Sequence, residues 1–149
     1  YIKKYKSIQP NFEEFKKFID DLVDKSKTNL IITTGVKDNL LINQFFQYFK
    51  KINNNLFEKK FNDRLIQLYI NIDFFDLEFL IENSNLVISC HGASTHLASA
   101  YNIKIYDIFD YSQKNFYLKW IAHIKNYSYF YRENFSDLSK KILNKILIF

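Results

Sequence analysis

The sequence predicts an α/β fold, a parallel sheet of about five strands with helices on both faces. Short apolar runs alternate along the chain with segments of helical spacing, and right-handed helical crossovers are the usual connection between parallel strands. The chain of 149 residues is 48% hydrophobic and 25% charged, with 2 Gly and 1 Pro. This composition is typical of a globular protein, and the length suits one domain, residues 1–149.

The first third of the chain predicts helix, strand and helix. Asn11–Lys27 has helical spacing, with Glu13 and Glu14 in its first turn. Asn29–Thr34 is a short β-branched run that predicts a buried strand, and Asp38 is the expected N-cap of the next helix. The apolar positions of the two helices are Phe12, Phe15, Phe18, Ile19 and Leu22, then Leu41, Phe45, Tyr48, Phe49 and Ile52.

Further alternation follows to the end of the chain. Asn53–Asn55 marks a turn, Leu65–Ile70 predicts a strand, and the segment between them has no clear pattern. Asp73 is the expected cap of a helix that stops near Asn83. Strands are then expected at Leu86–Cys90, Ile103–Phe109 and Tyr127–Tyr131, and helices at Ser94–Tyr101, Lys114–Ile124 and Ser136–Leu147.

The ends of the predicted strands indicate where a ligand would bind. Gly35, Ile72, His91 and Asp110 each follow a predicted strand. Because the carboxyl ends of parallel strands meet at one edge, we expect these loops to lie together, and ligands of open α/β sheets bind at that edge.

The most informative segment is Val87–Ala100, where an apolar run stops at His91-Gly92 and small and hydroxyl residues follow. We expect Gly92 to allow a tight turn and a close approach of the backbone to a ligand. The start of the next helix presents unpaired N–H groups and the positive end of its dipole, which suits phosphate. Hydroxyls of Ser94 or Thr95 and the ring of His96 would add donors. The alternative is a capped helix beside one buried histidine.

Other side chains have structural explanations. Cys90 beside His91 suggests a nucleophile, but a buried structural thiol explains it as well. Asp73 and Asp76 suggest paired carboxylates, but helix capping accounts for both. His123 is expected to be packed or at the surface, Arg132 to lie on an edge strand, and the closing amphipathic helix to pack on the core rather than on a membrane.

Composition limits the partners. The net charge is +5 and the lysines are scattered, so we expect no nucleic-acid partner, while weak contact with anionic lipid headgroups stays open. A single Cys excludes an internal disulfide and fits a reducing, cytoplasmic compartment. No apolar run is long enough for a membrane span. Because the chain opens on Tyr1 and contains no Met, we expect it to be a piece of a larger protein.

Leu86–Asp110 resembles the nucleotide-sugar-binding half of GT-B glycosyltransferases, most of all the bacterial heptosyltransferase family. In that family a strand leads into Asp-[Thr/Ser]-Gly-Pro-x-His-[Leu/Met]-Ala-[Ala/Ser]-Ala, and His96–Ala100 matches the second half of this motif. The first half differs, since His91, Gly92, Ala93 and Ser94 stand where the family has Asp, Thr or Ser, Gly and Pro. A His-Gly-Ala element is similar to other GT-B transferases. The resemblance covers residues 11–132, and Asp38 stands at the family's acidic position.

The resemblance implies a Rossmann-like half-domain that holds a nucleotide diphosphate sugar. The phosphate side would be lined by His91, Gly92, Ala93, Ser94, Thr95 and His96, and the base and sugar side by Gly35, Val36, Lys37, Asp38, Ile72 and Asp73. No metal and no cofactor are expected, because the helix start supplies the positive field.

The resemblance also implies partners outside this chain. The catalytic base is expected in a preceding acceptor-binding half, so this piece alone should be inactive. The acceptor would be a glycan or lipid-linked glycan of the cell envelope or capsule, handled at the inner face of the membrane. Two other functions stay open: a non-catalytic α/β regulatory or interaction domain, and a degenerate transferase half with a structural role.

Overall fold

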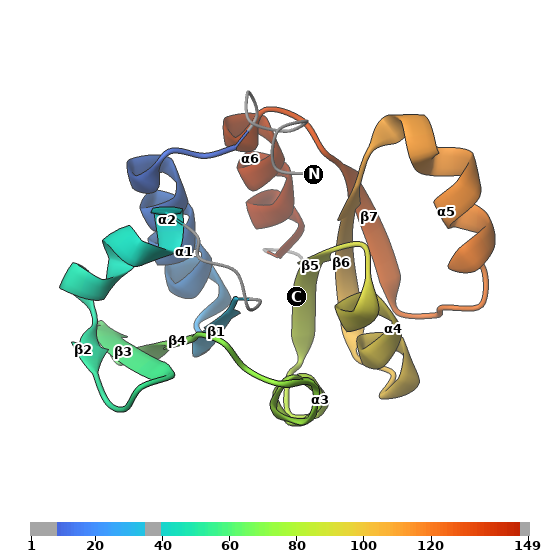
Figure 1. Cartoon of the computed structure of the whole chain (residues 1–149). Helices are drawn as coiled ribbons and strands as arrows, with labels where there is room; N and C mark the ends of the chain where they lie inside the picture. The colour runs from blue at the N-terminus through green and yellow to red at the C-terminus, as the bar shows by residue number, and fades with distance from the viewer. Residues whose placement is uncertain (1–8, 35–39, 147–149) are drawn as a thin grey trace. The chain divides into compact units, whose positions relative to one another are not determined.

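The computed structural model describes residues 9–34 and 40–146, and the chain forms two compact units (Figure 1). The first unit contains Gln9–Asp73 together with residues 143–146, and the second contains Phe74–Ile142. Each unit has its own sheet.

Helix α1 (Phe12–Ser26) opens the first unit with a complete capping box. The Asn11 side chain accepts a hydrogen bond of 2.9 Å from the Glu14 N–H, and the Glu14 carboxylate accepts one of 2.9 Å from the Asn11 N–H. The helix ends at Lys27, whose φ of 56° lies in the left-handed region. The predicted helix at Asn11–Lys27 is confirmed.

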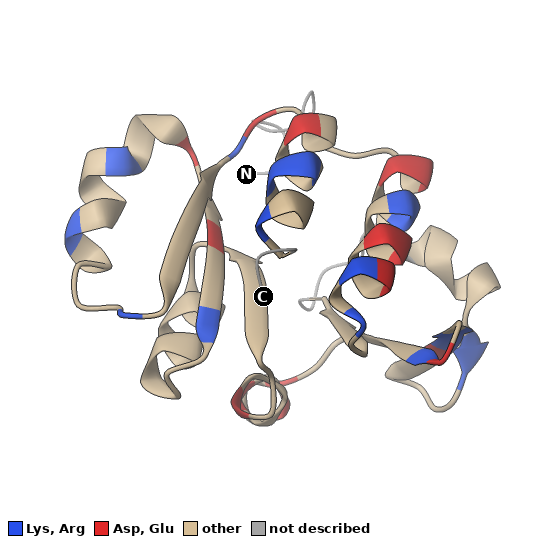
Figure 2. Ribbon diagram, turned by 180° about the vertical axis from the view of Figure 1, so that it is seen from behind, with Lys and Arg blue, Asp and Glu red and all other residues tan. Residues whose placement is uncertain are grey.

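The sheet of this unit is mixed, with the order β1-β4-β3-β2. Strand β1 (Leu30–Thr33) pairs in parallel with β4 (Arg64–Tyr69), which pairs antiparallel with β3 (Leu56–Phe61). Strand β2 (Lys50–Lys51) joins β3 antiparallel and is blue in Figure 2 because both of its residues are lysines. Asn62 turns β3 into β4 with a φ of 53°, which Asn tolerates better than most residues.

The sequence prediction for the middle of this unit is wrong. Helical spacing predicts one helix up to Ile52, but α2 spans Leu40–Asn43 and is followed by the 3-10 helix η2 (Gln44–Tyr48) and then β2. The pattern misses β3 because Lys59 interrupts its apolar alternation. The Lys59 ammonium lies 3.2 Å from the Asp20 carboxylate of α1, so an ionic partner compensates for a lysine on the same strand face as buried Phe57. The antiparallel strands β2 and β3 also correct the expectation of a sheet that is parallel throughout.

Aromatic residues fill the core of this unit. Phe45 lies edge-on to Phe12 and Phe15, with ring centroids 4.8 Å and 5.7 Å apart. The buried members of the core are Ile19, Val23, Phe45, Phe49, Phe57, Ile66 and Leu68. These rings serve packing between helices and sheet.

The second unit contains a parallel sheet with the order β5-β6-β7. Its elements are α3 (Phe74–Glu82), β5 (Leu86–Cys90), α4 (Ala93–Ala100), β6 (Lys104–Phe109), η3 (Tyr111–Gln113), α5 (Lys114–Trp120), β7 (Tyr127–Tyr131) and α6 (Phe135–Ile146). The three strands were placed from the sequence almost to the residue. The expectation of α/β structure with parallel strands is confirmed in this unit.

Helices lie on both sides of the β5-β6-β7 sheet. Helices α4 and α5 occupy one side, and the part of α6 up to Ile142 lies on the other (Figures 1 and 2). On the α4 side, Ile81, Ala98 and Ile105 form a buried cluster. On the opposite face of β6, the ring of Tyr106 packs against Phe130 at 5.5 Å. The sheet is therefore covered on both faces, as its apolar strands require.

Helix α4 ends in a Schellman motif. Asn102 adopts a left-handed φ of 56°, and its N–H donates to the Ser99 carbonyl at 3.0 Å. The Ile103 N–H donates to the Ala98 carbonyl at 2.8 Å. These bonds satisfy the last carbonyls of the helix and direct the chain into β6. None of the helices in the described ranges is long and apolar enough to cross a membrane.

Candidate functional site

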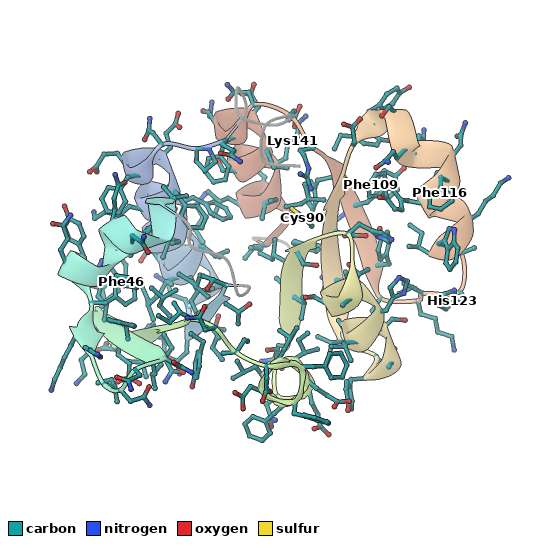
Figure 3. The ribbon with its side chains drawn as sticks, viewed as in Figure 1. Phe46, Cys90, Phe109, Phe116, His123 and Lys141 are labelled. Carbon is teal, nitrogen blue, oxygen red and sulfur yellow. The ribbon has the colours of Figure 1, made fainter. Side chains whose placement is uncertain are left out.

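The connection from β5 to α4 carries the six residues predicted for the phosphate side, His91–His96. His91 follows the end of β5 and donates its N–H to the Ile108 carbonyl of β6 at 3.1 Å. Helix α4 begins at Ala93, one residue before its predicted start, and Gly92 is its N-cap. The loop therefore lies at the carboxyl end of the parallel sheet, where Figure 3 labels Cys90 on β5 and Phe109 on β6.

Gly92 has a different role from the expected one. Its φ of 166° is extended backbone that any residue adopts, and an added Cβ would lie 3.7 Å from the Cys90 carbonyl oxygen. Its N–H is held 3.4 Å from the Thr95 hydroxyl. The turn therefore does not require glycine. A Cβ atom at residue 92 would occupy the space beside the backbone without a clash.

A buried carboxylate lies beneath this loop. Asp107, in the middle of β6, is fully buried. It accepts hydrogen bonds from His91 Nδ1 at 2.5 Å, Tyr127 OH at 2.6 Å and Thr95 Oγ1 at 3.2 Å. A buried carboxylate requires such donors, since an uncompensated charge in the interior is strongly unfavourable.

The cluster fixes the ring of His91. An ionised carboxylate only accepts hydrogen bonds, so Nδ1 carries the hydrogen and Nε2 lies at the opposite edge of the ring. The His91 side chain is 10% exposed. Its ring centroid lies 4.1 Å from that of Tyr117 on α5 and 5.5 Å from that of His96. Asp107 thus holds an imidazole in one tautomer and one orientation beside the start of α4.

Thr95 supports the loop from inside. It is fully buried, its hydroxyl donates to Asp107, and Ser89 Oγ lies 3.4 Å away. This corrects the expectation that the Thr95 hydroxyl faces a ligand. Ala93 and His96 are exposed and Ser94 is half-buried, so these residues present the surface of the loop.

Two titratable groups near the cluster are held protonated. Burial, with a further contribution from the hydrogen bond to Asp107, raises the pKa of Tyr127, so this hydroxyl stays a donor. Packing around the sulfur atom raises the pKa of the Cys90 thiol, although the residue is exposed at the strand end. Arg132 acts against this shift and Asp107 adds to it. A protonated thiol is a poor nucleophile, so the raised pKa does not support a nucleophilic role, and the exposure of Cys90 corrects the expectation of a buried thiol.

The second predicted group of site residues falls partly outside the described residues and partly in the other unit. Gly35, Val36, Lys37 and Asp38 lie outside the described residues. Half-buried Ile72 and exposed Asp73 belong to the other unit, directly before α3. The structure therefore brings together His91, Thr95 and His96 with Asp107, and the base and sugar side stays a prediction.

Asp107 and Tyr127 are missing from the sequence interpretation. The signal for Asp107 is an acidic residue inside the apolar run Ile105–Phe109, where burial of both strand faces leaves no solvent for a charge. His91 is a donor within reach of this carboxylate. Parallel strands β5 and β6 place Cys90 beside Ile108, so His91, the next residue after Cys90, lies close to Asp107. Tyr127 of β7 pairs with Ile105 of β6, which lies two residues before Asp107 on the same strand.

The described residues contain no group of three His, Cys, Asp or Glu side chains that could hold a metal ion. Comparison of the chain with protein-family models, curated proteins and solved structures finds no match.

Proposed function

We propose that this chain is the donor-binding half of a glycosyltransferase that uses a nucleotide diphosphate sugar. The observation that carries the proposal is the loop at the carboxyl end of β5, where helix α4 begins between two histidines. The exposed residues Ala93 and His96 belong to the first turn and a half of that helix. On this proposal the chain is the donor-binding part of a two-domain protein.

The start of α4 would bind the diphosphate. The N–H groups at the first positions of a helix have no intrahelical partner, and the helix dipole adds a positive field. His96 would donate to a phosphate oxygen from the helix surface, and the ring of His91 would face it from the loop. When the bond to the sugar breaks, negative charge grows on the departing diphosphate, and donors placed in advance stabilise it.

Asp107 would act as a positioning residue for this step. Asp107 is fully buried, so it would not touch a ligand at the surface. It would act on the ligand by setting the tautomer and orientation of His91. Its negative charge also opposes a phosphate nearby, so the three hydrogen bonds that it accepts would limit this repulsion.

The remaining parts of the proposed activity lie outside this site. The catalytic base would come from an N-terminal acceptor domain, and the acceptor would be a glycan or lipid-linked glycan. The reaction would take place in the cytoplasm at the inner face of the membrane. The base and sugar would be contacted by residues near Asp38 and Asp73, as the resemblance implies.

The buried cluster also favours a second candidate, a transferase-like half with a structural role. The polar atoms of Thr95 and His91 Nδ1 are already bonded to Asp107, as expected if the motif serves stability. The two candidates differ in whether the chain binds nucleoside diphosphates.

Calorimetric titration with UDP, ADP, GDP and CMP tests the proposal. We expect a nucleoside diphosphate to bind more tightly than its nucleoside, and His96→Asn to weaken binding about tenfold, the worth of one charge-assisted hydrogen bond. Lys119→Gln is the control, because Lys119 is an exposed residue of α5 that lies outside the β5–α4 loop. Equal affinity for nucleoside and nucleoside diphosphate, or no binding, would favour the structural role.

A further inference from the structure

A second surface of the β5-β6-β7 unit is lined by hydrogen-bond donors. It is an open depression of about 560 Å³ on the side of α4. Its lining residues are His96, Ser99, Ala100, Asn102, His123 and Lys125. The volume is in the range of small-molecule sites. Figure 3 labels His123, which precedes β7 and thus lies toward the opposite end of the strands from Cys90.

The charge of this depression is positive. None of its lining residues is acidic, and Lys125, His96 and His123 supply cationic or neutral donors beside the Ser99 hydroxyl and the Asn102 amide. All three basic residues are exposed. The ion pairs found within the described residues do not include Lys125. An anion entering here would meet donors from two loops and one helix.

Hydrogen bonds join the loop and the helix end that line the depression. The Asn126 side chain donates to the carbonyl and to the side-chain oxygen of Asn102 at 3.0 Å and 3.1 Å. The Asn126 carbonyl accepts from the Ile105 N–H at 2.8 Å. These bonds join the loop that carries His123 and Lys125 to the end of α4. A site built on such connected elements loses little entropy when a ligand binds.

The depression reaches the end of α4, where the negative end of the helix dipole would repel an anion. The Schellman bonds from Asn102 and Ile103 already engage the Ser99 and Ala98 carbonyls. The Asn102 carbonyl is engaged by Asn126. The Ala98, Ser99 and Asn102 carbonyls are therefore hydrogen-bonded, which weakens their repulsion of an anion.

We propose that this depression is a phosphate-binding subsite that takes a small polar phosphate ester. It contains no Phe, Tyr or Trp on which a nucleobase could stack, whereas its hydroxyl and amide groups suit the hydroxyl groups of a sugar-like molecule. The subsite extends from His96 towards the end of α4 and does not require nucleotide binding at the start of the helix. His96 is the residue that the two sites share.

The test is a titration with inorganic phosphate at fixed pH and ionic strength, observed through imidazole NMR signals. The chain has three histidines, so single His→Asn variants assign every signal. We expect His96 and His123 to shift along one saturating curve, and His91, whose side chain is 10% exposed, to shift much less. Acetate at equal concentration should produce smaller shifts. Equal shifts with acetate, or a His123 signal that does not move, would overturn the proposal.

Matched variants complete the test. Lys125→Gln should weaken phosphate binding about threefold to fivefold, as expected for a partly exposed charge pair. Lys119→Gln, an exposed lysine of α5 outside the depression, should leave it unchanged. Ser99→Ala, which keeps helix propensity, should also weaken binding. Equal effects of the two lysine variants would overturn the subsite. Nucleoside diphosphate shifts at His91 without phosphate shifts at His123 would leave the proposed function standing and refute this one.

Discussion

The imidazole of His91 and the carboxylate of Asp107 are joined by a hydrogen bond of 2.5 Å between neighbouring strands β5 and β6. The carboxylate is fully buried and the imidazole side chain is 10% exposed. The pair therefore connects the interior of the sheet with the loop that begins α4. The orientation of the His91 ring in this loop depends on the pair.

Replacement of the buried carboxylate should destabilise the protein strongly. Asp107→Asn puts an NH₂ donor among three side chains that now donate to the carboxylate, which leaves buried polar groups unsatisfied. We expect a loss of about 3 kcal/mol in the free energy of unfolding, measured by urea denaturation. Glu82→Gln, which removes an exposed carboxylate at the end of α3, should change it by less than about 0.5 kcal/mol. Equal effects would show that Asp107 is not the centre of a stabilising cluster.

The Tyr127 hydroxyl should contribute less than the carboxylate. Tyr127→Phe removes one of three donors to Asp107 and leaves two, so we expect a loss of about 1–2 kcal/mol in the free energy of unfolding. Tyr129→Phe on the same strand is the control, because Tyr129 is 39% exposed. A smaller effect of Tyr127→Phe than of Tyr129→Phe would contradict the role of Tyr127 in the cluster.

Cys90 should react slowly with thiol reagents in the folded protein. Burial raises the pKa of its thiol, so the thiolate fraction at pH 8 is lower than in the unfolded chain. Alkylation by iodoacetamide should accelerate as the pH rises above 9 and on unfolding in urea. Arg132 lowers this pKa, so Arg132→Gln should slow alkylation further. Since the chain has 1 Cys, mass spectrometry reports this site alone. Faster alkylation in Arg132→Gln would contradict the assignment.

Gly92→Ala separates folding from binding. The extended φ of Gly92 and the ordinary 3.7 Å contact of an added Cβ predict a change of less than about 1 kcal/mol in the free energy of unfolding. If a diphosphate approaches this backbone, the added methyl group should weaken binding of a nucleoside diphosphate severalfold. Unchanged affinity in a folded Gly92→Ala protein would exclude a close approach of phosphate at this residue.

Sequence patterns predict the second unit well because each of its elements has a simple period. Strands β5, β6 and β7 are short apolar runs between helical segments, and Asn102 marks the end of α4. The first unit is harder, because β3 places Lys59 on the same face as buried Phe57 and compensates for it through Asp20, which is distant in sequence. Local periodicity cannot reveal such a partner.

The site shows the same division. The loop residues His91–His96 are recognisable locally, since a strand ends and a helix starts there. The role of Thr95 depends on Asp107, and that of Gly92 on a backbone angle that composition does not determine. The signal that was present is the acidic residue in the apolar strand β6, which indicates a buried polar cluster even without coordinates.

The central claim is that the start of α4 binds a diphosphate, and the imidazole NMR signals of His91 and His96 test it most directly. During titration with UDP, ADP or GDP, both signals should shift along one saturating curve, and the matching nucleoside should shift them less. Absent shifts, or equal shifts with nucleoside and nucleoside diphosphate, would contradict the claim.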